Sequence, residues 1–271
     1  MNRTLIIGDL HQQIQPIENL SQSLNYFYAQ PLDRTDTIIC LGDVGANFFL
    51  NKRDIEFKEK LKSYPCRFFL IRGNHEQRPS ILSEKSNGAW AVQSFLDGSV
   101  WVEYDYPNIL YAMDYPCTYN INGHSTLVVP GAYSVDKYYR LANHWTWFEK
   151  EQLDESEKDY GRFLCEKSNY KFDIVLSHTC PKIYMPTDLF LPTIDQSIVD
   201  NSMEEYLGEL EYKLDYKLWC FGHYHKLRIY PQYEDKQVVM LFQNEALNID
   251  KFFETENVYK SLIAGAEGEL K

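Results

Sequence analysis

Five short apolar runs in this sequence each end in polar residues whose side chains can bind metals. The runs cover residues 4–7, 37–41, 67–71, 173–176 and 218–221, and their β-branched and aromatic residues favour buried strands. The polar ends read Gly8-Asp9-Leu10-His11, Gly42-Asp43, Gly73-Asn74-His75-Glu76, Ser177-His178 and Gly222-His223-Tyr224-His225. A buried strand has no structural need for such groups at its end. The pattern therefore predicts an α/β protein with a site at its strand ends.

The first three runs are spaced like the strands of βαβ units. Their ends lie about thirty residues apart, which is the length of such a unit. Pro16 begins a stretch with helical spacing of apolar residues, and residues 52–62 form a second helical stretch. Because parallel strands present their carboxyl ends at one edge of a sheet, where α/β proteins bind ligands, we expect the three ends to lie together.

The rest of the chain predicts further sheet and helix within the same domain. Short apolar runs between residues 98 and 130 indicate a second, partly antiparallel sheet. We expect an acidic helix over residues 148–165, a loop over 185–202 and a helix over 203–214. Two runs after His225, residues 227–230 and 238–242, predict a closing hairpin. Because no repeat or linker interrupts the sequence, we expect a single domain over residues 1–271.

Charge and cysteine content narrow the class of function. The net charge of −12 argues against a broad nucleic-acid-binding surface, although bound divalent metals would still allow an anionic substrate. The six cysteines form no C-x-x-C pair. The amino-terminal apolar stretch is too short for a signal peptide, and no uncharged run has the length of a membrane span. We therefore expect a reduced, cytoplasmic protein that does not enter the membrane.

Eight residues at the strand ends are candidate metal ligands or their neighbours. Any one of them could simply cap a strand or be satisfied in the core, but eight together indicate a metal site. They are His11, His75, His178, His223, His225, Asp9, Asp43 and Asn74. Carboxylate, imidazole and amide ligands without thiolate suit Mn, Fe or Zn. The two histidines of the last motif could each serve one of two ions that share a ligand and lie about 3.5–4 Å apart.

The order D-x-H, G-D, G-N-H-E, S-H and G-H-x-H resembles that of the calcineurin-like metallophosphoesterase superfamily. The resemblance extends from Asp9 to His225 and implies a four-layer αββα sandwich, in which two mixed β-sheets pack face to face with flanking helices. It also implies two divalent transition-metal ions. By motif, Asp9, His11 and His225 would hold one ion, Asn74, His178 and His223 would hold the other, and Asp43 would bridge both.

The same resemblance implies hydrolysis of a phosphate ester. A hydroxide between the two ions would attack phosphorus, because coordination lowers the pKa of water from about 15.7 toward 7. His75 would act as the general acid for the leaving oxygen. Glu76 would either orient His75 or serve as a surface or capping residue.

One departure from the family pattern bears on the substrate. Phosphoprotein phosphatases continue the second motif as G-D-x-V-D-R-G, whereas Ala46 and Asn47 replace that Asp and Arg here. The final G-H-x-H is more similar to phosphodiesterase and nuclease branches. We therefore expect a phosphodiesterase acting on nucleotides or oligonucleotides. The alternatives are a phosphomonoesterase acting on small metabolites or phosphoproteins, and a non-catalytic scaffold, which the complete ligand set disfavours.

Three basic residues are candidate phosphate contacts: Arg78, Lys137 and Arg140. Each could equally be a solvated surface charge. Lys137 and Arg140 lie in the segment 133–140 beside Tyr133, Tyr138 and Tyr139, whose rings would suit base stacking. The sequence leaves the exact substrate, the native metals and the oligomeric state open.

Overall fold

The computed structural model describes residues 3–190 and 192–264, and its strands form two mixed sheets. The first has eight strands in the order β14-β13-β1-β2-β3-β6-β5-β4, and the second has six in the order β11-β12-β10-β9-β8-β7. The first sheet contains β1 (Thr4–Ile7), β2 (Thr37–Cys40), β3 (Arg67–Leu70), β4 (Trp90–Phe95), β5 (Gly98–Glu103), β6 (Ile109–Ala112), β13 (Glu245–Asn248) and β14 (Leu262–Ala264). The second contains β7 (Cys117–Ile121), β8 (His124–Val129), β9 (Ile174–Ser177), β10 (Leu218–Phe221), β11 (Arg228–Ile229) and β12 (Gln237–Met240).

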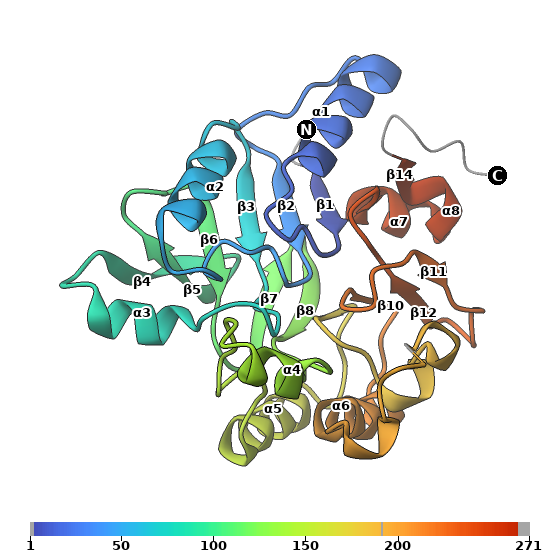
Figure 1. Ribbon diagram of the computed structural model, residues 1–271. Coiled ribbons are helices and arrows are strands. Elements are labelled where there is room, and N and C mark those ends of the chain that lie inside the picture. Colours follow the sequence, from blue (N-terminus) through green and yellow to red (C-terminus); the bar gives the residue numbers. More distant parts are fainter. Residues whose placement is uncertain (1–2, 191, 265–271) are drawn as a thin grey trace.

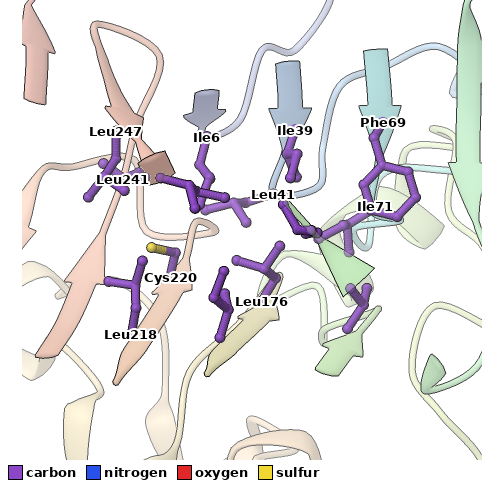
Figure 2. Close-up of a cluster of buried hydrophobic side chains, with 14 of the residues drawn as sticks. Ile6, Ile39, Leu41, Phe69, Ile71, Leu176, Leu218, Cys220, Leu241 and Leu247 are labelled. Carbon is purple, nitrogen blue, oxygen red and sulfur yellow. The ribbon is translucent and has the colours of Figure 1, made fainter. Parts of the chain in front are cut away.

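The helices flank the two sheets (Figure 1). They are α1 (Gln15–Tyr28), α2 (Lys52–Lys62), α3 (Pro79–Lys85), α4 (Lys137–Ala142), α5 (Glu155–Lys167), α6 (Ser202–Lys213), α7 (Ile249–Thr255) and α8 (Val258–Ser261). Apolar residues of α1 and α2 pack on the first sheet, and those of α5 and α6 pack on the second. The inner faces form a third core between the sheets. Figure 2 shows this core, with side chains from both sheets directed toward one another: Ile6, Ile39, Phe69, Leu176, Leu218 and Cys220. The predicted αββα sandwich is confirmed.

The strand order confirms the predicted arrangement of the first three strands. β1 pairs with β2 and β2 with β3, both in parallel. In the second sheet β9 pairs in parallel with β10, and β10 with β12. The carboxyl ends of β1, β2 and β3 therefore emerge at one edge of the first sheet, and those of β9 and β10 at one edge of the second.

The prediction for residues 98–130 is wrong about sheet membership. β5 and β6 belong to the first sheet, whereas β7 and β8 belong to the second. Residues 113–116, which end in Pro116, connect the two sheets. Alternation of apolar residues indicates a strand but not its partner, so the pattern could not reveal this crossing. The hairpin β4–β5 and the pairing of β13 with β14 were also absent from the prediction.

One helix begins later than the sequence predicts, because a capping box sets its first residue. The acidic helix begins at Glu155 rather than Phe148, because Asp154 and Glu157 form a capping box. Apart from residue 191, which lies outside the described part, residues 185–201 form a loop with short 3₁₀ turns over Thr187–Leu189 and Gln196–Ile198, and Ser202 already begins α6. The hairpin predicted after His225 is confirmed as β11 and β12, which pair antiparallel.

The single domain over residues 1–271 stays a prediction, and residues 1–2, 191 and 265–271 of that range lie outside the described part of the chain. Within the described residues, no helix combines the length and apolar character needed to cross a membrane.

Candidate metal centre

The predicted ligands meet where the strand ends of the two sheets face each other. Asp9 and His11 follow β1, Asp43 follows β2 and Asn74 follows β3. His178 follows β9, and both His223 and His225 follow β10. Three groups bring ligand atoms within 4.8 Å of one another: Asp9 with His11 and His225, His11 with Asp43 and His75, and Asp43 with His178 and His223. The structure therefore brings together His75 and six of the seven predicted metal ligands, and the seventh, Asn74, lies 3.0 Å from His178.

The first group has the spacing of ligands around one ion. The Nε2 atoms of His11 and His225 are 2.8 Å apart, and His225 Nε2 is 3.4 Å from Asp9 Oδ2. His11 Nε2 lies 3.9 Å from the same oxygen. Ligands at about 2.0–2.2 Å from a transition metal are separated by about 2.8–3.6 Å, so two of the three separations fit one divalent ion and the third, from His11 to Asp9, is slightly longer. The Asp9 carboxylate also raises the pKa of His225 through a hydrogen bond.

The second group surrounds His178. His178 Nδ1 donates to the Leu41 carbonyl at 2.6 Å, so its Nε2 carries the free lone pair in the neutral ring. That Nε2 lies 3.0 Å from Asn74 Oδ1 and 3.5 Å from Asp43 Oδ1. A lone pair that faces two oxygens needs a cation or a proton between them. Burial opposes protonation, but the Asp43 carboxylate outweighs it and raises the pKa of His178 to about 9.

Asp43 belongs to both the His75 group and the His178 group. Its Oδ1 accepts the backbone N–H of His75 at 2.8 Å, and its Oδ2 lies 3.6 Å from His75 Nδ1. Burial works against the charged carboxylate, yet the neighbouring His75 and His178 hold the pKa of Asp43 well below its usual value. A buried, ionised carboxylate between two groups of nitrogen ligands suits a shared anionic ligand.

The pKa of His223 shifts in the opposite direction to that of His178. Burial and the adjacent His178 lower the pKa of His223 to about 3, which keeps this ring neutral and able to bind a metal. The rings of His178 and His223 are 4.9 Å apart, whereas His225 turns toward His11. The two imidazoles of the G-H-x-H motif therefore diverge as expected. Both histidines have positive φ, 68° for His223 and 55° for His225, and such strain is typical of functional sites.

Glycine is required where these loops touch the carboxylates. A Cβ at Gly222 would lie 2.2 Å from Asp9 Oδ1, and a Cβ at Gly73 would lie 2.1 Å from Asp43 Oδ1. Both contacts are far shorter than any allowed approach, so only glycine permits them. The backbone N–H of His223 then donates to Asp9 Oδ1 at 3.0 Å.

Two residues that orient Asn74 were missing from the prediction. Asn74 Nδ2 donates to Ser134 Oγ at 3.0 Å, and Ser134 Oγ donates to Glu151 Oε2 at 2.5 Å. This chain directs Asn74 Oδ1 toward His178. Ser134 and Glu151 lie in irregular segments with no periodic pattern, so nothing in the sequence marks them.

Glu76 neither orients the His75 ring nor lies on the surface. Its buried carboxylate accepts the backbone N–H groups of Gly45 at 3.1 Å and Gly73 at 3.2 Å. It thus joins the loops after β2 and β3 rather than orienting the His75 ring. Burial and the nearby Asp43 raise the pKa of Glu76 to about 8.

Two cavities open on the centre at different candidate ligands. The larger, about 810 Å³, is lined by His11 and His75 and by six further side chains that dominate its walls: Phe48, Phe49, Arg53, Arg140, His144 and Trp145. We call it the arginine cavity. The smaller, about 320 Å³, reaches His223 and His225 and has mostly apolar walls, among them Met185, Leu189, Phe190 and Val199.

The three predicted phosphate contacts differ in their surroundings. Arg140 lines the arginine cavity. The Lys137 ammonium instead lies 4.6 Å from the centre of the Trp147 ring and outside that cavity's lining. Arg78 is buried, and its guanidinium binds the Glu157 carboxylate and the carbonyls of Lys150 and Gln152. The prediction for Arg78 is therefore wrong, because its donors are used within the protein.

The family model described as calcineurin-like phosphoesterase matches residues 2–227. No curated protein sequence matches the chain. One similar solved structure is phosphopantetheinyl hydrolase from Mycobacterium tuberculosis, with 13% identity, 99% of this chain and 97% of that chain covered, and a TM-score of 0.46. A dimetal phosphatase from Danio rerio has 11% identity, coverage of 91% and 95%, and a TM-score of 0.47. A further structure reaches a TM-score of 0.51 at 12% identity, with coverage of 92% and 95%, and bears on the fold alone.

Proposed function

The chain belongs to the calcineurin-like phosphoesterase family, and from this premise we propose that it hydrolyses a phosphodiester with two divalent metal ions bound between its two sheets. The observation that carries the proposal is the position of Asp43, whose buried carboxylate groups with His178 and His223 on one side and with His11, a ligand of the other proposed ion, on the other. A carboxylate shared in this way is the feature that a two-ion site needs.

We assign the ligands as the motifs suggest. Asp9, His11 and His225 hold one ion, Asn74, His178 and His223 hold the second, and Asp43 bridges them. Mn, Fe or Zn suits this set of oxygen and nitrogen donors. When bound, the ions lower the pKa of water toward neutrality and neutralise charge on the phosphoryl group. The cytoplasmic location also remains our proposal, and it agrees with six cysteines that are all free thiols.

His75 serves as the proton donor to the leaving oxygen. Its side chain is 20% exposed, lines the arginine cavity and lies within reach of Asp43 through Nδ1. A leaving group in the arginine cavity would therefore meet His75 directly. Asn74, oriented through Ser134 and Glu151, directs its oxygen toward His178.

The two cavities favour a diester over a monoester. A diester has two organic substituents, and the site has one space beside His11 and His75 and another beside His223 and His225. The positions at which phosphoprotein phosphatases carry Asp and Arg are occupied by Ala46 and Asn47, which are both buried. Neither can bind a phosphate from solution.

Metal content and a substrate screen test this function. Protein loaded with Mn, Fe or Zn should hold about two ions per chain by elemental analysis. Asp43→Asn should lower the occupancy of both sites, whereas Asp105→Asn, the same change at an exposed position, should leave it unchanged.

The screen then compares phosphomonoesters with linear and cyclic dinucleotides and single-stranded oligonucleotides. We expect kcat/KM to be higher for diesters. A preference for monoesters would make the protein a phosphatase, and protein that takes up no metal would contradict the proposed function as a whole.

A further inference from the structure

The arginine cavity is free of carboxylates although the whole chain has a net charge of −12. Two arginines and three histidines line it, and no Asp or Glu side chain of the described residues does so. We propose that this cavity binds a leaving group that combines a flat ring with a phosphate of its own, as a nucleotide does. The inference rests on the proposed function and adds the chemical class of the leaving group.

A row of aromatic rings connects His75 with Arg53. The Phe48 ring lies 5.4 Å from the His75 ring with an angle of 32° between their planes. Phe49 lies 4.7 Å from Phe48, and the guanidinium carbon of Arg53 lies 3.5 Å from the centre of the Phe49 ring. A ligand that extends away from the leaving oxygen therefore meets apolar ring surface first and a cation after it.

Arg53 has no carboxylate partner among the described residues. Its side chain is exposed and forms no ion pair there. The neighbouring Lys52 pairs with Glu56, and the Asp54 carboxylate accepts the backbone N–H groups of Phe49 and Leu50. The charge of Arg53 is thus held over a ring at the cavity wall and remains available to a ligand.

Arg140 supplies a second and less available cation. Its guanidinium carbon lies 5.8 Å from the Phe48 ring, on the same cavity. Its Nε already donates to Asp136 Oδ1 at 2.7 Å and its Nη1 to the Thr146 carbonyl at 3.3 Å. Arg53 is therefore the residue that we expect to discriminate between charged and neutral leaving groups.

The phosphate and the flat ring of such a ligand each have a matching group on the cavity wall. Guanidinium groups bind phosphate through paired, charge-assisted hydrogen bonds. Bases stack on aromatic side chains and Arg planes without regard to sequence. In the hydrolysis, water oxygen bonds to phosphorus, the bond to the leaving oxygen breaks and His75 supplies the proton to that oxygen. The products are a phosphomonoester and a nucleoside that retains its own phosphate.

The test compares dinucleotides that differ by one phosphate. The substrates are ApA, pApA and ApAp, and product analysis identifies which nucleoside leaves. A phosphate on the leaving nucleoside should raise kcat/KM by about 10- to 100-fold, the value of a hydrogen bond to a charged group. Arg53→Gln should remove most of this gain in kcat/KM. Lys52→Gln, the same change one residue away and outside the cavity, should preserve the gain.

A binding measurement separates this inference from the proposed function. Calorimetry with adenosine 3′,5′-bisphosphate on the metal-free protein should give weaker binding to Arg53→Gln than to the wild type or Lys52→Gln. If ApA is hydrolysed but the added phosphate brings no gain, the inference is wrong and the proposed function stands. If the bisphosphate binds through Arg53 while no diester is hydrolysed, the proposed function is wrong and only the ligand class of the cavity survives. Equal binding to all three proteins would contradict the inference directly.

Discussion

At the scale of single residues, His75 stands between the candidate metal centre and the arginine cavity. Its Nδ1 lies 3.6 Å from Asp43, and its ring contacts Phe48 and His11, which also line the arginine cavity. A proton donor and a metal ligand would both fit such a place, and the two differ in what their removal does. The general acid matters only when the leaving oxygen is basic, whereas a ligand affects every substrate.

His75→Ala should therefore slow the hydrolysis of nucleotide or alkyl esters by about 10²–10⁴-fold and cost far less with a p-nitrophenyl ester. A nitrophenolate can leave without a proton, so it bypasses the missing acid. The measurement is kcat for both substrates together with metal content, and His124→Ala, a histidine stacked on Phe253, is the control. An equal loss with both metals retained would mean that His75 positions phosphate, and a loss of metal would make it a ligand.

At the scale of helices and strands, Arg78 joins two elements that lie far apart in the sequence. It precedes α3, and its guanidinium binds Glu157, which belongs to the capping box of α5. Both side chains are largely buried, with exposed fractions of 8% and 17%. Breaking such a pair leaves one charge without a partner inside the protein.

Arg78→Met should lower the free energy of unfolding by about 3 kcal/mol, toward the low end for a broken buried pair because Glu157 keeps some exposure. Adding Glu157→Gln should restore part of that loss, since the uncompensated carboxylate disappears. Urea denaturation measures both, with Arg34→Met as the exposed control. Should Arg78→Met unfold at the same urea concentration as the control, the pair contributes nothing to stability.

The elements themselves were predictable where the signal is local. The strands β1, β2 and β3 and the helix α2 follow from apolar runs and periodicity, and the metal motifs follow directly from their ends. The sheet to which β5 and β6 belong was not predictable, because a strand pattern carries no information about its neighbour. The pairing of Arg78 with Glu157 spans 79 residues, and the cavity walls combine Phe48 with Trp145. Such contacts depend on the assembled fold.

At the scale of the whole molecule, many thiols and phenols are buried. Five of the six cysteines are buried, and burial raises the pKa of Cys66 and of Cys165 to about 12, from an ordinary value of 9.0. Burial likewise raises the pKa of Tyr106 to about 12, from 10.0. The folded protein therefore keeps protons that the unfolded chain loses at moderately alkaline pH.

This difference predicts alkaline instability. The contribution of these groups is complete below the unfolded values of 9.0 and 10.0 and is lost as the pH rises through about 12, because the unfolded state then binds fewer protons. The free energy of unfolding in urea should be lower at about pH 10.5 than at about pH 8. Tyrosinate absorbance should rise together with unfolding. A free energy that is equal at the two pH values would contradict the prediction.

The division of the proposed ligands between two sheets also has a consequence for the order in which the protein is made. Asp9, His11, Asp43 and Asn74 leave the ribosome early, whereas His178 and the pair His223 and His225 follow much later. A growing chain thus carries only the half of the site that belongs to β1, β2 and β3. On the proposed assignment, each ion would receive its full set of ligands only after β10 has joined β9. If two metals bind as proposed, their stable retention would therefore mark that synthesis has passed residue 225 and that the second sheet has closed on the first.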